Sequence, residues 1–460
     1  MKHQRKLVCR LLALWGAGMI FWPAADAGAA SLSLQQAIDM ALQQNTALRV
    51  TQKGEDTAAA TLKSAKGTNG VSASLSDSLS VSKDSDSDRA SSNSLSVSAS
   101  LPLYSGGKNQ ARIESGEIGV DAARLTTQRA QEDLKLNVIK AYYDALEAKK
   151  TIDVAQESVD NYQAHLTNVE QLYSAGSKAR IDVLRSSVEL SNAKQTLIKD
   201  KNSYEVNLAT LRNYLNMNRA EPLTLTDDFS YTAFPQQMQE CIDYALLHRK
   251  DILAAEYALK QKELAVKMAK ADYLPTLSLT AGSTLLNSQF EPNSNTGHDI
   301  RAGLSASWNI FDSGVTAAAV QSAETERDIA KLNLDKDKED VDLALRQAYL
   351  NMREAEERFN STSDAVHQAE EDFFIAKEKY RAGEGIMLDI IDAQKALSEA
   401  KLNYITAQYD YARYKATVEN VMGLDLTEGE TAAADNLRLT MDSAVKELSV
   451  VEQARAREDS

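Results

Sequence analysis

Histidines, cysteines and carboxylates are the residues of this chain that could do chemistry, and their spacing does not favour catalysis. His165, His248, His298 and His367 show no metal-ligand spacing to one another or to Cys241. The sequence contains no GxSxG, HExxH or GxxxxGKS/T motif, which excludes the common hydrolase, metalloprotease and phosphate-loop signatures. Paired carboxylates are frequent, but on solvated helical faces they are ordinary surface residues. We therefore predict that the chain is not an enzyme and uses no cofactor or metal ion.

The residues that stand out belong to a tyrosine–glycine–aspartate motif that occurs twice. The motif supplies seven candidate residues: Tyr173, Gly176 and Asp182 in the first copy, and Tyr380, Gly383, Asp389 and Asp392 in the second. An aspartate where a loop enters a helix most often caps that helix, so capping is the local expectation for Asp182 and Asp389. Asp392 lies one turn further on, where a helix-dipole or solvated role is expected. The tyrosines are expected to pack, and the glycines to supply a left-handed turn.

Matches at one constant separation indicate that the whole chain is a duplication. The two tyrosines of the motif lie 207 residues apart, and so do its glycines and its first aspartates. The same separation relates YSGG at 104–107 to FDSG at 311–314. Further upstream, 41–50 matches 245–254 at a separation of 204. Both copies should therefore contain the same elements in the same order.

Four segments alternate with a period of two residues and are predicted to be strands: 71–82, 93–104, 276–287 and 300–311. In VSASLSDSLSVS, at 71–82, serine occupies every even position and apolar residues hold most odd positions. A disordered serine-rich linker is the alternative for 71–100, since low-complexity polar tracts often lack structure. Asp77 falls on the apolar phase, and a β-bulge there would account for it.

The rest of each copy is predicted to be helical. A helix is expected at 33–66 and again at 237–271, and proline-free stretches cover 105–174 and 312–381. At ~1.5 Å per residue, seventy residues form a helix of roughly 105 Å. A 3-4 spacing of apolar residues predicts a coiled-coil seam in both long helices: Val159, Tyr162, Leu166, Val169 and Tyr173, then Val366, Ala369, Phe373, Ala376 and Tyr380. Returning helices at 183–217 and 390–422 would make each motif the tip of a long helical hairpin.

The N-terminal thirty residues have the pattern of a secretory signal peptide. A short basic region precedes the apolar run LLALWGAGMIFW and a small-residue stretch. An uncleaved membrane anchor is the alternative. The chain has a net charge of −15 and no basic tract, which argues against a nucleic-acid partner. After residue 30 no apolar run approaches the ~20 residues of a membrane helix, so membrane entry would require a β-barrel.

These patterns define the expected organisation of the chain. It comprises a signal peptide at 1–30, a first repeat at 31–217 with its tip at 173–182, a connector at 218–236, a second repeat at 237–423 with its tip at 380–389, and a tail at 424–460. Four strands cannot close a barrel, and open edges are not viable in lipid, so closure demands several subunits. We therefore predict a mixed α and membrane-β fold, in which three subunits supply a twelve-stranded barrel above a periplasmic barrel of coiled-coil helices.

The set of features in this order resembles the TolC-like outer-membrane efflux proteins. The resemblance rests on the duplication, the tips, the YSGG and FDSG junctions and the paired strands, and it covers 31 to about 423. It implies a homotrimeric channel in the outer membrane that extends into the periplasm. It further implies a periplasmic adaptor protein, an inner-membrane pump reached through that adaptor, and contact with outer-membrane lipid. The connector and the tail would form an equatorial belt around the helices.

The resemblance also assigns roles to the tip residues. It implies acidic rings at the entrance from Asp389 and Asp392, which would attract cations. It implies a closed-state lock that includes Tyr380 and Asp182. The tips at Tyr173, Gly176 and Gly383 would contact the adaptor. Gly385 stands where the family often has a basic residue of the lock, and Lys178 or Arg180 is the candidate substitute.

Two functions follow from the predicted architecture. The first is an export duct of a tripartite efflux or type I secretion system, with passive conduction through a gated acidic entrance. The second is a structural tether that spans the periplasm on a membrane-anchored barrel without transport. The acidic tips and the serine-rich strand faces favour the duct, because a tether has no reason to line a lumen with polar side chains.

Overall fold

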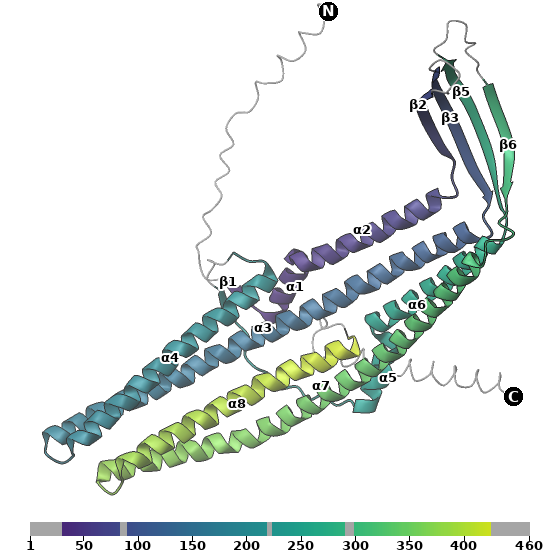
Figure 1. Cartoon of the computed structure of the whole chain (residues 1–460). Helices are drawn as coiled ribbons and strands as arrows, with labels where there is room; N and C mark the ends of the chain where they lie inside the picture. The colour runs from purple at the N-terminus through teal and green to yellow at the C-terminus, as the bar shows by residue number, and fades with distance from the viewer. Residues whose placement is uncertain (1–29, 83–89, 219–222, 290–298, 425–460) are drawn as a thin grey trace, which may run out of the picture.

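The computed structural model describes residues 30–82, 90–218, 223–289 and 299–424. Most of the predicted signal peptide, most of both strand-connecting loops and nearly all of the C-terminal tail lie outside these residues. The described part is elongated, with a β-sheet at one end and two helical tips at the other (Figure 1). The predicted division between strands and helical hairpins therefore corresponds to the two ends of the molecule.

The same order of elements occurs twice along the chain. The first set is β1 (Ala30–Leu32), α1 (Leu34–Gln44), α2 (Thr46–Gly67), β2 (Ser72–Ser82), β3 (Ala90–Tyr104), α3 (Lys108–Ser174) and α4 (Arg180–Leu215). The second set is β4 (Leu223–Leu225), α5 (Met238–His248), α6 (Lys250–Lys270), the 3-10 turn η1 (Ala271–Tyr273), β5 (Thr276–Gln289), β6 (Asp299–Ser307), α7 (Val315–Ala382) and α8 (Met387–Met422). The structure thus follows the duplication seen in the sequence.

The expectation of one continuous helix at 33–66 and at 237–271 is wrong in both copies. Asn45 and Arg249, which are equivalent residues, take extended backbone angles and break each segment into two helices. Each residue also binds the end of a returning helix at equivalent carbonyls. Asn45 Nδ2 donates to the Tyr214 carbonyl oxygen at 3.0 Å, and Arg249 Nη1 donates to that of Val421 at 2.8 Å. The break therefore lets one side chain satisfy a helix C-terminus that lacks intrahelical partners.

The sheet is antiparallel throughout and has the strand order β2-β3-β5-β6. The disordered-linker alternative for 71–100 is therefore wrong where residues are described. Serines of β2 and β3 oppose each other on one face, and Ser74 Oγ lies 2.8 Å from Ser98 Oγ. The opposite face carries exposed apolar residues such as Leu75 and Leu79. One face of the sheet is hydroxylated and the other is apolar.

Two details of the sheet differ from the sequence prediction. Asp77 opposes Leu95 in an unbroken β2–β3 register, so the bulge expected there is wrong; the irregularity falls instead between β3 and β5, beside Leu95. β6 ends at Ser307 rather than 311. Trp308 leaves the ladder because its indole Nε1 donates to the Tyr273 carbonyl oxygen at 2.9 Å, at the junction with the helices.

The long helices fold back as two hairpins that lie side by side (Figure 1). We call α3–α4 the first hairpin and α7–α8 the second. α3 has 67 residues and α7 has 68, which corresponds to about 100 Å at 1.5 Å per residue. The loops at the tips are shorter than expected, since α4 and α8 begin three residues earlier than predicted. Among the described residues, no helix is both long and apolar enough to cross a membrane.

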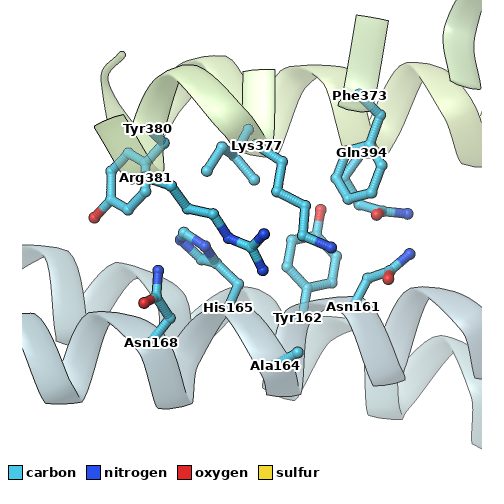
Figure 2. Close-up of a pocket in the computed structure, with 11 residues that line it drawn as sticks. Asn161, Tyr162, Ala164, His165, Asn168, Phe373, Lys377, Tyr380, Arg381 and Gln394 are labelled. Carbon is cyan, nitrogen blue, oxygen red and sulfur yellow. The ribbon is translucent and has the colours of Figure 1, made fainter. Parts of the chain in front are cut away.

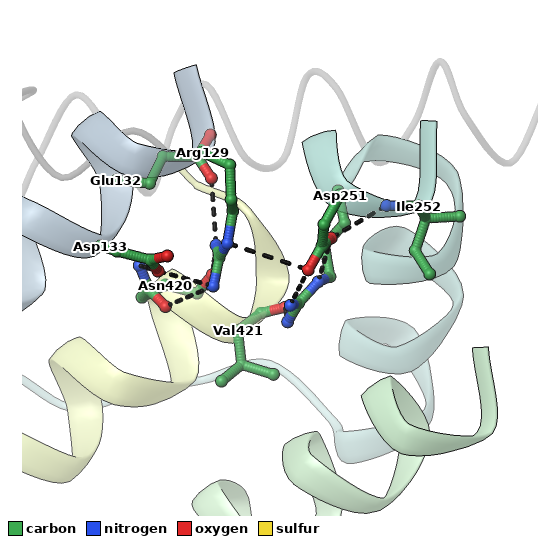
Figure 3. A network of polar contacts seen from close by, with 8 residues as sticks. Arg129, Glu132, Asp133, Asp251, Ile252, Asn420 and Val421 are labelled. Carbon is green, nitrogen blue, oxygen red and sulfur yellow. Dashed lines mark hydrogen bonds and ion pairs between the residues drawn. The ribbon is translucent and has the colours of Figure 1, made fainter. Parts of the chain in front are cut away.

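Polar networks join the two copies near the middle of the molecule. Arg129 of α3 donates to the Asn420 carbonyl oxygen at 3.0 Å and pairs with Glu132 at 3.1 Å and Asp133 at 2.8 Å (Figure 3). Arg249 pairs in turn with Asp251, which approaches Arg129 at 3.9 Å. These contacts fix the end of α8 against the first copy. We call this cluster of contacts around Arg129 the joint, and it lies far from both tips.

Two tyrosines at equivalent positions of α3 and α7 donate hydrogen bonds to the backbone of segments outside the helical hairpins. Tyr142 Oη donates to the Leu32 carbonyl oxygen at 2.9 Å, and Tyr349 Oη donates to that of Gln236 at 3.0 Å. β1 pairs with β4 in parallel beside Tyr142. The connector between the copies is bound to α3, because the Asp227 N–H donates to Tyr142 Oη at 3.4 Å, and to α7 through the Gln236 carbonyl oxygen.

Candidate functional site at the hairpin tips

Tyr380 is the centre of the contact between the two tips. Its side chain is only 2% exposed, and its ring centroid lies 5.3 Å from that of His165 in α3. The Lys178 amine lies 4.2 Å from the Tyr380 ring centroid. Burial raises the pKa of the Tyr380 phenol, and the nearby charge of Asp182 raises it further. Tyr380 and Asp182, both assigned to the predicted lock, are therefore close to each other in one subunit.

The Tyr380 hydroxyl is buried but has no hydrogen-bond partner among the described residues. Buried hydroxyl groups normally find a partner because desolvation without one costs about 1–3 kcal/mol. Figure 2 shows this hydroxyl directed away from the middle of the groove between the hairpins. Within the described part of one chain, the Tyr380 hydroxyl is therefore a hydrogen-bond donor without an acceptor.

The aspartates at the helix starts do not stand at the capping position that their sequence context predicts. α4 begins at Arg180 after Ala179, and α8 begins at Met387 after Ile386, so each aspartate is the third helical residue. Asp389 still satisfies a backbone group, because its Oδ2 accepts the Ile386 N–H at 3.0 Å. Asp182 is half-buried. Its charge adds to the rise that burial causes in the pKa of Tyr380, and it opposes the lowering that burial causes in the pKa of His165. Asp389 therefore has part of the expected capping role, because it binds a backbone N–H at the start of α8. Asp182 does not have this role among the contacts of the described residues.

The other acidic candidate is exposed. Asp392 and Asp389 both lie on the solvent-exposed side of α8. Burial raises the pKa of Tyr162 to about 12, with smaller contributions from the charges of Glu189 and Asp392. The structure thus separates the four gate candidates into two groups: Tyr380 and Asp182, which interact electrostatically, and the two exposed carboxylates of Asp389 and Asp392.

The expectation that Tyr173 packs in the seam is wrong in the single chain. Tyr173 is 46% exposed, whereas Val169, one turn earlier, is fully buried. The glycines of both tips have positive φ, 73° at Gly176 and 83° at Gly383, which confirms the left-handed turns. A Cβ at either glycine would meet no atom within 4 Å, so backbone conformation rather than crowding requires glycine there.

The loop around Gly385 leaves little room for a side chain, including the basic one that the family resemblance implies there. A Cβ at this position would lie 3.0 Å from the Tyr380 backbone nitrogen and 3.2 Å from the Lys379 carbonyl carbon. The Gly385 N–H donates to the Lys379 carbonyl oxygen at 3.1 Å and closes the loop tightly. A basic side chain does not fit this loop without displacement, and Lys178 is the cation that reaches Tyr380.

His165 is a component of the site that sequence reasoning missed, because it was judged only for metal-ligand spacing. Its Nε2 lies 2.8 Å from Met387 Sδ, and its ring packs on Tyr380. Burial lowers the pKa of His165, while the charge of Asp182 partly opposes this effect. Its place beside the seam residues Tyr162 and Leu166 was the available signal that it faces the second hairpin.

No group of three or more histidine, cysteine, aspartate or glutamate residues in the described ranges is arranged to hold a metal ion. Cys241 is buried in the core of the second copy, and burial raises the pKa of its thiol to about 12. The side chains at the tips therefore provide charge, aromatic contacts and a buried histidine. This arrangement can hold two hairpins together or attract ions.

Comparison with known proteins places this geometry in a family. The model of the family described as outer membrane efflux protein matches residues 37–217 and 241–424, which are the two copies. Outer membrane protein TolC of Escherichia coli is 23% identical over 324 residues, 68% of this chain and 65% of TolC. The pyoverdine export outer membrane protein OpmQ of Pseudomonas putida is 29% identical over 329 residues, 68% of this chain and 67% of OpmQ. The aligned segment thus spans about two thirds of each relative.

A solved structure has the same fold. The outer-membrane channel OprN superposes with a TM-score of 0.74 at 20% identity, over 86% of this chain and 91% of OprN. This likeness supports the fold that the duplication and the alternation predicted.

Proposed function

This chain belongs to the outer membrane efflux protein family, and we propose that it is an outer-membrane channel that conducts substrates outward from an inner-membrane pump. The observation that carries this proposal is the placement of a four-stranded sheet at one end of helical hairpins about 100 Å long. Such a subunit has the reach to connect the outer membrane with the inner side of the periplasm. The chain acts by conduction and not by catalysis.

The sheet supports assembly as a homotrimer. Within the described residues, β2 and β6 each pair on one side only. Unpaired strand edges are not viable in lipid, so the β6 edge of one subunit pairs with the β2 edge of the next. Three subunits give a closed barrel of twelve strands. The apolar face then meets lipid, and the serine face lines the lumen.

The tip residues take complementary roles in this assembly. The exposed Asp389 and Asp392 form acidic rings at the periplasmic entrance and attract cations. Tyr380, Asp182 and Lys178 hold the two hairpins of one subunit together when the entrance is closed. The exposed Tyr173 and the open space at Gly176 and Gly383 suit contact with the periplasmic adaptor protein.

The remaining segments complete the organisation of the chain. Residues 1–30 act as a signal peptide for export to the outer membrane. The connector at 218–236 forms part of an equatorial belt around the helices, whereas nearly all of the tail at 424–460, assigned to the same belt from the sequence, lies outside the described residues. Two contacts support this placement of the connector: the parallel pairing of β1 with β4, and the hydrogen bond from Tyr142 Oη to the Leu32 carbonyl oxygen in β1.

The channel is favoured over the structural tether for a specific reason. The relatives and the solved structure reported above carry names that describe outer membrane, export or channel proteins. In addition, paired serines give one sheet face a continuous row of hydroxyl groups. Such a face suits a water-filled lumen, whereas a tether would gain more from a packed apolar interior.

The test of assembly is the size of the purified protein on a mild detergent gel, with and without boiling. A heat-sensitive trimer is expected, because closure of the barrel requires three subunits. A protein that runs as a monomer without heating, although it is folded and inserted, would contradict the proposed channel.

A further inference from the structure

A groove lies between the two hairpins close to their tips, and its walls come from both. α3 contributes one side, and α7 with α8 contributes the other (Figure 2). The cavity has a volume of about 70 Å³. One water needs about 10–15 Å³ of such space, so the cavity suits several waters or one small organic anion such as acetate.

Two cationic side chains, Lys377 and Arg381, lie in the polar lining of this groove. Lys377 and Arg381 extend from α7 across the groove, and His165 rises toward them from α3 (Figure 2). No carboxylate is among the described residues that line the groove. The local charge is therefore positive, in a chain whose net charge is −15.

Among the described residues, neither cation has a buried ion-pair partner. Lys377 is half-buried and has no ion pair among the described residues. Arg381 Nη1 lies 2.9 Å from Glu378 Oε1, but both side chains of that pair are about half exposed. Exposed pairs contribute little, typically 0–1 kcal/mol, so most of the arginine's capacity to bind an anion remains. The nearby carboxylates of Asp182 and Asp392 interact electrostatically with His165 and Tyr162 respectively, and each favours a higher pKa in its partner.

The other walls complete a site for a small organic anion. Asn161 and Asn168 line the groove from α3 and offer neutral amide donors. Phe373 and Ile390 supply an apolar surface on the opposite side. A planar guanidinium matches the geometry of a carboxylate, and an ammonium adds a second charge-assisted hydrogen bond.

We propose that this groove is a carboxylate-binding site formed jointly by the two hairpins. The carboxylate belongs either to a free small molecule or to an acidic side chain of a second copy of this chain. Because the site exists only while the hairpins are together, an occupied groove stabilises that arrangement. This last consequence rests on the proposed function, in which the closed arrangement narrows the entrance.

Binding is tested directly on the purified full chain in detergent, independently of conduction. Saturation-transfer NMR is recorded on acetate, with neutral acetamide of nearly the same shape as the reference probe. Acetate should show transfer that acetamide lacks, and Lys377→Gln/Arg381→Gln should reduce the acetate signal at least about fivefold, as expected for the loss of two charge-assisted contacts. Lys395→Gln, an exposed lysine of α8 outside the groove, is the matched control and should leave the signal unchanged.

The heat stability of the oligomer separates the two sources of the carboxylate. If the second copy supplies it, acetate gives no transfer, but the double variant dissociates at a lower temperature than Lys395→Gln. If a free molecule supplies it, acetate binds and the dissociation temperature of the two variants is the same. Absence of acetate binding together with an unchanged dissociation temperature would overturn the proposal. Circular dichroism confirms that each variant retains its helices.

Discussion

The amine of Lys178, in the loop of the first hairpin, lies 4.2 Å from the centre of the Tyr380 ring in the second. A cation over an aromatic face is attracted by the ring, and the contact contributes about 0.5–1 kcal/mol at exposed sites. We propose that it substitutes for the basic residue that the family resemblance implies at Gly385, where a Cβ would crowd the Tyr380 backbone nitrogen at 3.0 Å. The tips of one subunit are therefore held by a cation from the other loop.

Removal of this cation should loosen the entrance. Lys178→Gln is expected to raise the open probability of single channels about two- to fivefold, which corresponds to the loss of about 0.5–1 kcal/mol. The measurement is single-channel recording in planar bilayers. Arg180→Gln is the matched control, since Arg180 carries the same charge on the same tip but has no ion pair among the described residues. An equal effect of both substitutions would show that overall charge, rather than the contact with Tyr380, matters.

Acidification should also open the entrance, through His165. Burial holds the pKa of this histidine below its usual value when the hairpins are together. When they separate, the pKa returns to about 6.5, so the separated state binds the proton more strongly. The closed arrangement therefore keeps its full stability above about pH 6.5 and loses it as the pH falls below that value. Lys377 and Arg381 line the same groove and would oppose the new charge. Among the described residues, Asp182 is the carboxylate whose charge favours it.

The pH response is measured as open probability between pH 7.5 and 5.5. His165→Gln should abolish the part of the response that depends on this histidine, and His367→Gln, an exposed histidine of α7, should retain it. A wild-type response that survives in His165→Gln would assign the effect to other groups, such as the crowded carboxylates of the entrance.

The contacts around Arg129 should contribute more to the free energy of unfolding than an exposed ion pair does. Glu132 is buried beside Arg129, and burial raises the pKa of this carboxyl although Arg129 opposes the shift. Arg129→Gln leaves Glu132 without its cation and frees the end of α8, which is expected to cost about 3 kcal/mol. Arg124→Gln removes an exposed pair with Asp121 and should cost less than about 0.5 kcal/mol. Urea unfolding followed by circular dichroism compares the two; equal midpoints would mean that the joint is dispensable.

Asp77 should be a cost to membrane insertion. It lies on the apolar face of β2, between Leu75 and Leu79, in a regular register that offers no bulge to redirect it. A carboxylate on a lipid-facing position is destabilising, so Asp77→Leu is expected to stabilise the inserted trimer by about 1 kcal/mol. The measurement is the temperature of trimer dissociation. Ser78→Leu, on the opposite face, should give no such increase; if Asp77→Leu lowers the temperature, this face does not meet lipid.

The duplication made most of the fold predictable from sequence. The constant separation between Tyr173 and Tyr380 identified two copies, and alternation in serine-rich segments identified strands that a composition argument alone would have left disordered. The breaks at Asn45 and Arg249 were not predictable from helical periodicity. They depend on tertiary contacts with the ends of α4 and α8, and an isolated segment does not contain this information.

The site was less predictable, because its residues meet across the hairpins. Local sequence placed Asp182 and Asp389 near helix starts but missed their exact position, since both helices begin two residues before these aspartates. Tyr380 was identified from the motif, whereas His165 and the groove cations Lys377 and Arg381 carried no motif. These three residues come together only because α3 packs beside α7 in the fold. Their spacing along the sequence does not indicate that they meet.

Single-channel conductance of the wild type and of Asp389→Ala/Asp392→Ala tests the central claim most directly. The account predicts a small, cation-selective current for the inserted wild-type trimer, because exposed carboxylates of three subunits would surround the entrance. The double variant should carry a larger current or lose its preference for cations. Correctly inserted trimers that carry no current in either form would contradict the proposed channel.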